Sequence, residues 1–203
     1  MISSPSTRLL AAAGAGVYAA CGLGYINHAA HESEVGARVM FASFGLYAGL
    51  GALRMAGHRR DPSVVASWGR SALAILGMLL PLAVRPEGRM LWGGGWWVAT
   101  AGAILGATSV VALGDCFCIA PALRGIVGRG PYRLVRHPMA AAFLVIAAGC
   151  LTVRWSPWNA VAFGLAALVG VLTLVCEEDL LRKDVRYREY ASRVPWWLVP
   201  GVV

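Results

Sequence analysis

Six long apolar runs constrain this chain more than any other feature of its sequence. A helix rises about 1.5 Å per residue, so roughly 20 apolar residues cross a hydrocarbon core of about 30 Å. Of the 203 residues, 58% are hydrophobic and only 14% are charged, whereas about a quarter of a soluble domain is charged. The sequence therefore predicts an all-α fold, a polytopic membrane helix bundle. Its predicted spans are residues 9–26, 35–56, 67–84, 94–113, 138–153 and 157–176.

The last two runs are short, and only residues 154–156 separate them. We therefore expect these two runs to form a helical hairpin that need not reach the far side of the membrane. One bundle accounts for the whole length of the chain, so residues 1–203 are predicted to be a single membrane domain.

The net charge of +8 is unevenly distributed along the chain. Arginines gather in the links after the second and fourth runs and in the C-terminal tail, whereas the first link, residues 27–34, has no Lys or Arg. Arg-rich links stay on the cytoplasmic side. We therefore expect both termini, the fourth link (114–137) and the tail to be cytoplasmic, and we expect no nucleic-acid partner. Arginine is used far more than lysine, and Ala and Gly are abundant. Such usage is typical of a GC-rich bacterial genome, so we expect the membrane to be a bacterial cytoplasmic membrane.

The tail, residues 177–194, has the pattern of an amphipathic helix leaving the sixth run. Apolar and aromatic side chains share one face of that helix and charged side chains share the other. Such a helix is expected to lie along the membrane interface. Its predicted buried face consists of Leu180, Tyr187, Tyr190 and Val194.

The cysteines and histidines do not have the spacing of a metal site. Cys116 and Cys118 form a Cys-x-Cys pair with no second pair to match it. His28 and His31 lie in the first link and are predicted to be surface residues. The sequence therefore predicts no metal.

A basic, turn-rich segment runs directly into the fifth apolar run. It holds Tyr132, Arg133, Arg136 and His137, and Pro138 starts the next helix. Arginines beside helix-start amides suit a carboxylate or a phosphate. The alternative is that the arginines only set the topology and that the histidine is interfacial.

Two adjacent carboxylates, Glu177 and Glu178, directly follow the sixth apolar run. Ionised carboxylates near hydrocarbon are costly and usually have partners or a function. Either of them is a candidate acceptor for the hydroxyls of a ribose. The alternative is that they are helix-end anions paired with Arg133 or Arg136.

The order of these motifs resembles the isoprenylcysteine carboxyl methyltransferase and phospholipid methyltransferase superfamily. The resemblance covers roughly residues 113–200. Its motifs are Leu113-Gly114-Asp115-Cys116-Phe117, Gly130-Pro131-Tyr132-x-x-x-Arg136-His137-Pro138, the apolar hairpin, Glu177-Glu178-x-x-Leu181 and Tyr187-x-x-Tyr190-x-x-x-Val194-Pro195.

The resemblance implies an integral membrane enzyme that uses S-adenosylmethionine. Residues 1–112 would then form N-terminal spans and residues 113–203 the cofactor-binding region. The methyl acceptor would be a lipophilic small molecule with a carboxylate, amine or thiol, surrounded by membrane lipids. An amine or thiol must lose a proton, and His137 or Glu178 is then the candidate base. By motif position the cofactor-binding residues would be Arg124, Gly125, Ile126, Val127, Tyr132, Arg136, His137, Pro138, Met139, Ala140 and Glu177.

The chain departs from the superfamily pattern at three places. Ala140 stands where the superfamily usually has Tyr, and the segment between the Glu pair and Tyr187 is shorter. Thr173 stands where isoprenylcysteine enzymes have an arginine, which counts against a prenylcysteine carboxylate as substrate. Two alternatives therefore stay open: a membrane reductase using NADPH, and an inactive membrane scaffold of the same fold.

Overall fold

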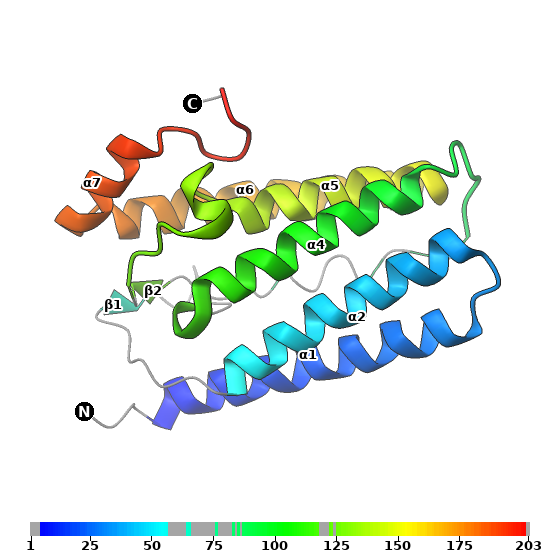
Figure 1. The fold of residues 1–203 in the computed structure, drawn as a ribbon, viewed down its shortest axis with the longest axis horizontal. Helices are drawn as coiled ribbons and strands as arrows, with labels where there is room; N and C mark the ends of the chain where they lie inside the picture. The colour runs from blue at the N-terminus through cyan, green and yellow to red at the C-terminus, as the bar shows by residue number, and fades with distance from the viewer. Residues whose placement is uncertain are drawn as a thin grey trace.

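The computed structural model describes residues 5–56, 64–65, 76, 83, 85, 87–117, 122–123 and 125–201 of the chain. In this part the predicted all-α fold is confirmed: long helices lie side by side (Figure 1). The α-helices are α1 (Pro5–His31), α2 (Val35–Ala56), α4 (Gly95–Leu113), α5 (Pro138–Val153), α6 (Pro157–Leu181) and α7 (Val185–Arg193). Two 3₁₀ turns, η2 (Gly114–Cys116) and η3 (Gly130–Arg133), and one two-residue antiparallel pairing, β1 (Val64–Val65) with β2 (Ala122–Leu123), complete the described elements.

Three of the described helices are long and apolar enough to cross a membrane by length and composition. They are α2, α4 extended by η2 (Gly95–Cys116), and α6. Helix α5, with 16 residues, is shorter. The predicted span 67–84 falls, apart from two residues, outside the described ranges, so the count of six spans stays a prediction.

Helices α4 and α5 approach each other closely because small residues line their contact. A Cβ atom added to Gly149 would lie 2.5 Å from the Ala99 nitrogen and 2.6 Å from the Gly95 oxygen. One added to Gly102 would lie 2.8 Å from the Ile146 nitrogen. Close backbone approach through glycine is the usual way in which membrane helices pack. This contact fixes the start of α5 against the end of α4, where the polar segment 130–137 lies.

The predicted hairpin of two short helices needs correction. Helix α6 has 25 residues and ends at Leu181, so its length is sufficient to cross a bilayer. Its start is capped by Ser156, whose hydroxyl accepts the Asn159 N–H at 3.1 Å. The apolar run alone underestimated α6, because the helix continues through the two glutamates.

The prediction of one continuous amphipathic tail helix was wrong. Helix α6 ends at Leu181, and α7 begins only at Val185. The Asp184 side chain accepts the Arg186 N–H at 2.8 Å, which is an N-cap and starts a new helix. Hydrogen bonds from Arg186 hold the pKa of Asp184 below its usual range. The predicted inner face is confirmed nonetheless, since Leu180, Tyr187, Tyr190 and Val194 are all buried.

The fourth link and the tail lie at the same end of the bundle, as predicted from the charge pattern (Figure 1). The Tyr190 hydroxyl donates to the Tyr132 carbonyl oxygen at 2.7 Å and joins α7 to η3. The residues of both predicted motifs therefore meet in space.

Candidate active site

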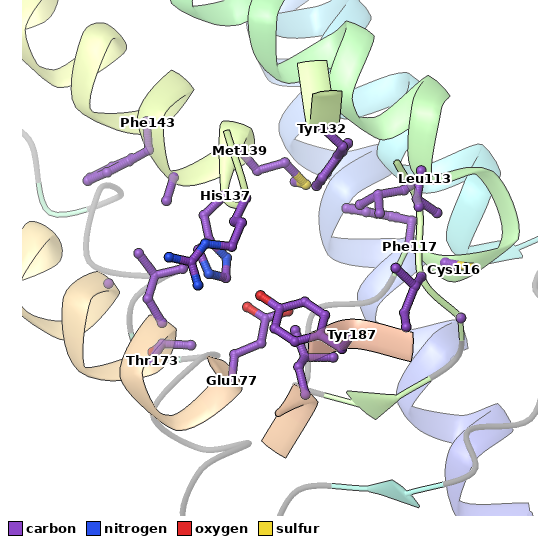
Figure 2. A pocket seen from close by; sticks show the side chains of 18 of the residues that line it. Leu113, Cys116, Phe117, Tyr132, His137, Met139, Phe143, Thr173, Glu177 and Tyr187 are labelled. Carbon is purple, nitrogen blue, oxygen red and sulfur yellow. The ribbon is translucent and has the colours of Figure 1, made fainter. Parts of the chain in front are cut away.

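A cavity of about 330 Å³ lies where the polar link, the helix ends and the tail meet. Cavities of this size hold small ligands. Figure 2 shows Glu177 projecting from α6 toward the middle of the cavity, between His137 and Tyr187. The lining residues come from α1, α2, α4, η2, the link, α5, α6 and α7.

Most of the predicted cofactor residues line this cavity. Pro138 is fully buried at the start of α5 and is absent from the lining. Glu178 is not among the residues that line the cavity, and Arg124 is outside the residues that the structure describes. The predicted residues that line the cavity are Gly125, Ile126, Val127, Tyr132, Arg136, His137, Met139, Ala140 and Glu177.

Glu178 is the centre of a buried polar cluster. It is 4% exposed, and its carboxylate contacts four donors. Arg136 Nη1 donates to Oε1, and Arg182 Nε donates to the same oxygen at 3.0 Å. The Tyr187 hydroxyl donates to Oε2 at 2.6 Å, and His137 Nε2 lies 3.1 Å from Oε2. We call these five side chains the Glu178 cluster.

The C-terminal segment fixes the two cluster residues of the link through its backbone. The Arg136 and His137 amides donate to the carbonyl oxygens of Trp196 and Trp197, each at 2.9 Å. Arg136 Nη2 donates to the Pro195 oxygen at 2.7 Å. The Trp197 ring also packs edge-on against His137, with centroids 5.9 Å apart. The pair Arg136–His137 is thereby held from both the α6 side and the tail.

Several polar atoms at the cavity have no partner among the residues that the structure describes. Within the described part of the chain, neither the Glu177 carboxylate nor the Tyr132 hydroxyl has a hydrogen bond to another group. The Arg136 Nε is buried and likewise unpaired. Burial, and then the nearby Glu177 carboxylate, raise the pKa of Tyr132 well above its usual range, so the phenol keeps its proton. An unpaired buried polar atom such as the Arg136 Nε is costly, and a ligand with a matching group relieves that cost.

The rest of the cavity wall is apolar and partly aromatic. Leu113, Phe117, Met139 and Phe143 surround the polar centre (Figure 2). Ala140, which stands where the superfamily pattern has Tyr, is part of this wall. The site therefore suits an amphipathic ligand, or two ligands that meet at the polar centre.

The lining residues that sequence reasoning missed include two tyrosines, Tyr18 of α1 and Tyr47 of α2. Both stand in apolar runs, where a phenol is a polar group inside a span. That feature was the available signal. It did not indicate whether the side chain faces the interior of the bundle, because the packing of the helices decides which face of a span is internal.

Comparison with known proteins relates part of the chain to a protein family. No curated protein and no solved structure is significantly similar to the chain. A family model described as phospholipid methyltransferase matches residues 87–187. Together with helices apolar enough to cross a membrane, this match indicates a membrane methyltransferase. Through residues 87–187, the chain belongs to the phospholipid methyltransferase family, within the isoprenylcysteine/phospholipid methyltransferase superfamily.

Proposed function

We propose that this protein transfers a methyl group from S-adenosylmethionine to a lipophilic small molecule in the membrane. The observation that carries the proposal is the Glu177 carboxylate, which has no partner among the described residues and projects into a 330 Å³ cavity in the part of the chain that matches the family. A carboxylate that lines a cavity and has no partner among the described residues is available to accept hydrogen bonds from a ligand.

The unpaired groups fit the cofactor. Glu177 would accept the ribose hydroxyls, and its charge would favour the nearby sulfonium. Arg136, with its unpaired Nε, would bind the methionine carboxylate. The remaining proposed cofactor residues are Gly125, Ile126, Val127, Tyr132, His137, Met139 and Ala140 at the cavity, Pro138 at the helix start, and Arg124. S-Adenosylmethionine, when bound, supplies a methyl group already activated by its sulfonium.

The protein's own contribution would be positioning and exclusion of water rather than covalent catalysis. The apolar rim around Glu177 and His137 would shield the reacting atoms. The arginine-rich link and the tail would lie on the cytoplasmic side, from which the cofactor would enter.

His137 is the better of the two candidate bases. Its Nε2 faces the Glu178 carboxylate at 3.1 Å, so the proton of the neutral ring sits on Nε2 and Nδ1 keeps a lone pair. Glu178 already faces four donors, which leaves its carboxylate little capacity to take a proton. An amine or thiol acceptor would need this base, whereas a carboxylate acceptor would not.

Binding and turnover of the purified protein in nanodiscs test the proposal. We expect calorimetry to show binding of S-adenosylhomocysteine and no binding of NADPH. Methyl-labelled S-adenosylmethionine should then label one of three probes: dodecanoate, dodecylamine or dodecanethiol. Binding of NADPH alone would establish the reductase alternative. Binding of neither nucleotide would leave a scaffold and overturn the proposal.

A further inference from the structure

Residues 194–199, which follow α7, turn back toward the bundle and lie against residues 136 and 137 of the link (Figure 1). We call this segment the C-terminal strap. The carbonyl oxygens of Trp196 and Trp197 accept the amides of Arg136 and His137, each at 2.9 Å. The strap lies beyond residues 87–187, the part of the chain that matches the family. Its backbone bonds fix where the strap runs, whatever side chains stand at positions 196 and 197.

The Trp197 side chain contacts both of these link residues. The Arg136 Cζ atom lies over the indole ring, 5.7 Å from its centroid. The ring also packs against the His137 imidazole, with centroids 5.9 Å apart and planes at 73°. Arg136 and His137 line the cavity, whereas Trp197 does not. The indole therefore supports two cavity residues from outside the cavity.

Lipid anchoring is the usual role of a tryptophan near a membrane surface. Trp196 and Trp197 are both half-buried, but they differ in their ring contacts. Among the residues that the structure describes, the Trp196 ring has no aromatic or cation–π contact with Arg136 or His137. The ring contacts of Trp197 are with the site, which lipid anchoring alone does not require.

The guanidinium of Arg136 is held at several points. Its Nη1 donates to Glu178 Oε1, and its Nη2 donates to the Pro195 carbonyl oxygen at 2.7 Å. Its Nε is buried and has no partner among the described residues. A guanidinium beside an indole ring is attracted to that ring. Trp197 therefore favours one orientation of the guanidinium plane, and with it one direction of the unpaired Nε–H.

The His137 ring is restricted in a similar way. Its Nε2 lies 3.1 Å from Glu178 Oε2, and a contact at one atom alone leaves the ring free to rock about that atom. The Trp197 ring packs against the imidazole and limits this motion. One indole ring thus restrains the two cavity residues that carry the basic side chains of the site.

We propose that Trp197 is a positioning residue, whose indole ring holds Arg136 and His137 in the orientation in which they meet the amino-acid end of the cofactor. The inference rests on the proposed function, in which Arg136 binds the methionine carboxylate and Glu177 binds the ribose. Loss of the Trp197 ring should then affect the amino-acid end of a bound ligand and leave its nucleoside end unaffected.

Two ligands that differ at the amino-acid end test this inference. S-Adenosylhomocysteine and 5′-methylthioadenosine share the nucleoside and its sulfur, but the second ligand has neither the amino group nor the carboxylate. Calorimetry measures the binding of each ligand to the purified protein in nanodiscs. Trp197→Leu removes the ring, Trp197→Phe keeps an aromatic ring, and Trp196→Leu is the matched control. All three variants keep the carbonyl groups that accept the Arg136 and His137 amides.

We expect Trp197→Leu to weaken the binding of S-adenosylhomocysteine about threefold to thirtyfold, the factor that corresponds to one cation–π contact. Binding of 5′-methylthioadenosine should stay unchanged. Trp197→Phe should restore most of the lost affinity, and Trp196→Leu should leave both ligands unaffected. Glu177→Gln, by contrast, should weaken both ligands, because both carry the ribose.

Equal weakening of both ligands by Trp197→Leu would overturn the inference, because a general structural role does not distinguish them. Unchanged affinity for S-adenosylhomocysteine would overturn it as well. Thermal unfolding verifies that each variant is folded, and Trp197→Met, which also lacks a ring, takes the place of Trp197→Leu if that variant does not fold. Failure of the proposed function has a different signature: the wild-type protein does not bind S-adenosylhomocysteine, and the inference fails with it.

Discussion

Glu177 and Glu178 are neighbours near the end of α6, but they belong to two different regions of the molecule. Glu178 is in a buried cluster where Arg136, His137, Arg182 and Tyr187 surround its carboxylate. Glu177 belongs to the cavity wall, where its carboxylate has no partner in the described part of the chain. Successive residues of a helix point about 100° apart, so one helix turn supplies both regions.

The contrast separates residues that stabilise the fold from residues that are available to bind a ligand. Removing a partner from a satisfied buried ion pair leaves an unpaired charge and destabilises the fold strongly. Removing a group that has no partner changes the fold little and changes ligand binding instead. Substitutions in the two regions should therefore affect different measurements.

The largest effect is expected for Glu178→Gln. Arg136, which is 6% exposed, would lose its counter-charge, at a cost of about 3–5 kcal/mol in the free energy of unfolding. Thermal and denaturant unfolding of the purified protein in nanodiscs measure this loss. Glu189→Gln on the exposed face of α7 is the matched control and should have no effect. An unchanged melting temperature for Glu178→Gln would show that the cluster does not stabilise the fold.

Glu177→Gln should have the opposite profile. We expect S-adenosylhomocysteine to bind about 1–3 kcal/mol more weakly, because a charged hydrogen-bond acceptor is lost. The melting temperature of the ligand-free protein should not fall, since Glu177 has no partner to lose among the described residues. Calorimetry gives the first quantity and thermal unfolding the second. Unchanged affinity with a lower melting temperature would make Glu177 a structural residue at the helix end.

A pair of Tyr→Phe substitutions sharpens the comparison without changing charge. Tyr187→Phe removes a 2.6 Å hydrogen bond to the Glu178 carboxylate and should cost about 1.5–3 kcal/mol of stability. Tyr132→Phe removes a hydroxyl that has no partner among the described residues and should change stability by less than about 0.5 kcal/mol. Unfolding of both variants under one condition is the measurement. Equal losses would contradict the distinction between the two regions.

The smallest effect is expected at the solvent-facing edge of the cluster. Arg182 also donates to Glu178, at 3.0 Å, but its side chain is 57% exposed. Exposed pairs four residues apart contribute about 0.3–0.5 kcal/mol. Arg182→Gln should therefore lower stability only slightly in an unfolding titration. A loss as large as that of Glu178→Gln would place Arg182 among the essential members of the cluster.

The helices themselves were largely predictable from sequence. The bounds of α2 and α5 coincide with the predicted runs, because Pro138 starts α5 and the apolar composition marks the rest. The motifs of the link and the tail were correctly expected at one end of the bundle, since arginine keeps both on one side.

The tail and the roles of individual residues were less predictable. The apolar pattern from Leu180 to Val194 fits one helix as well as two, and the break depends on the Asp184 cap. The reach of Tyr18 and Tyr47 into the cavity depends on Gly51 and Gly106 of neighbouring helices. Contacts of this kind join residues far apart in the chain, and no local pattern contains them.

By itself, the sequence determined that this chain forms apolar helices and that its polar chemistry lies in the basic link and the glutamate pair. Composition and helix length suffice for these conclusions, because a backbone that crosses the hydrocarbon core must satisfy its hydrogen bonds internally, and apolar helices of about 20 residues do so. Only the tertiary structure decided that Glu178 holds the fold together while Glu177 faces the cavity. Both residues have the same chemistry, and the packing of α6 against the link and α7 alone determines which carboxylate meets the donors.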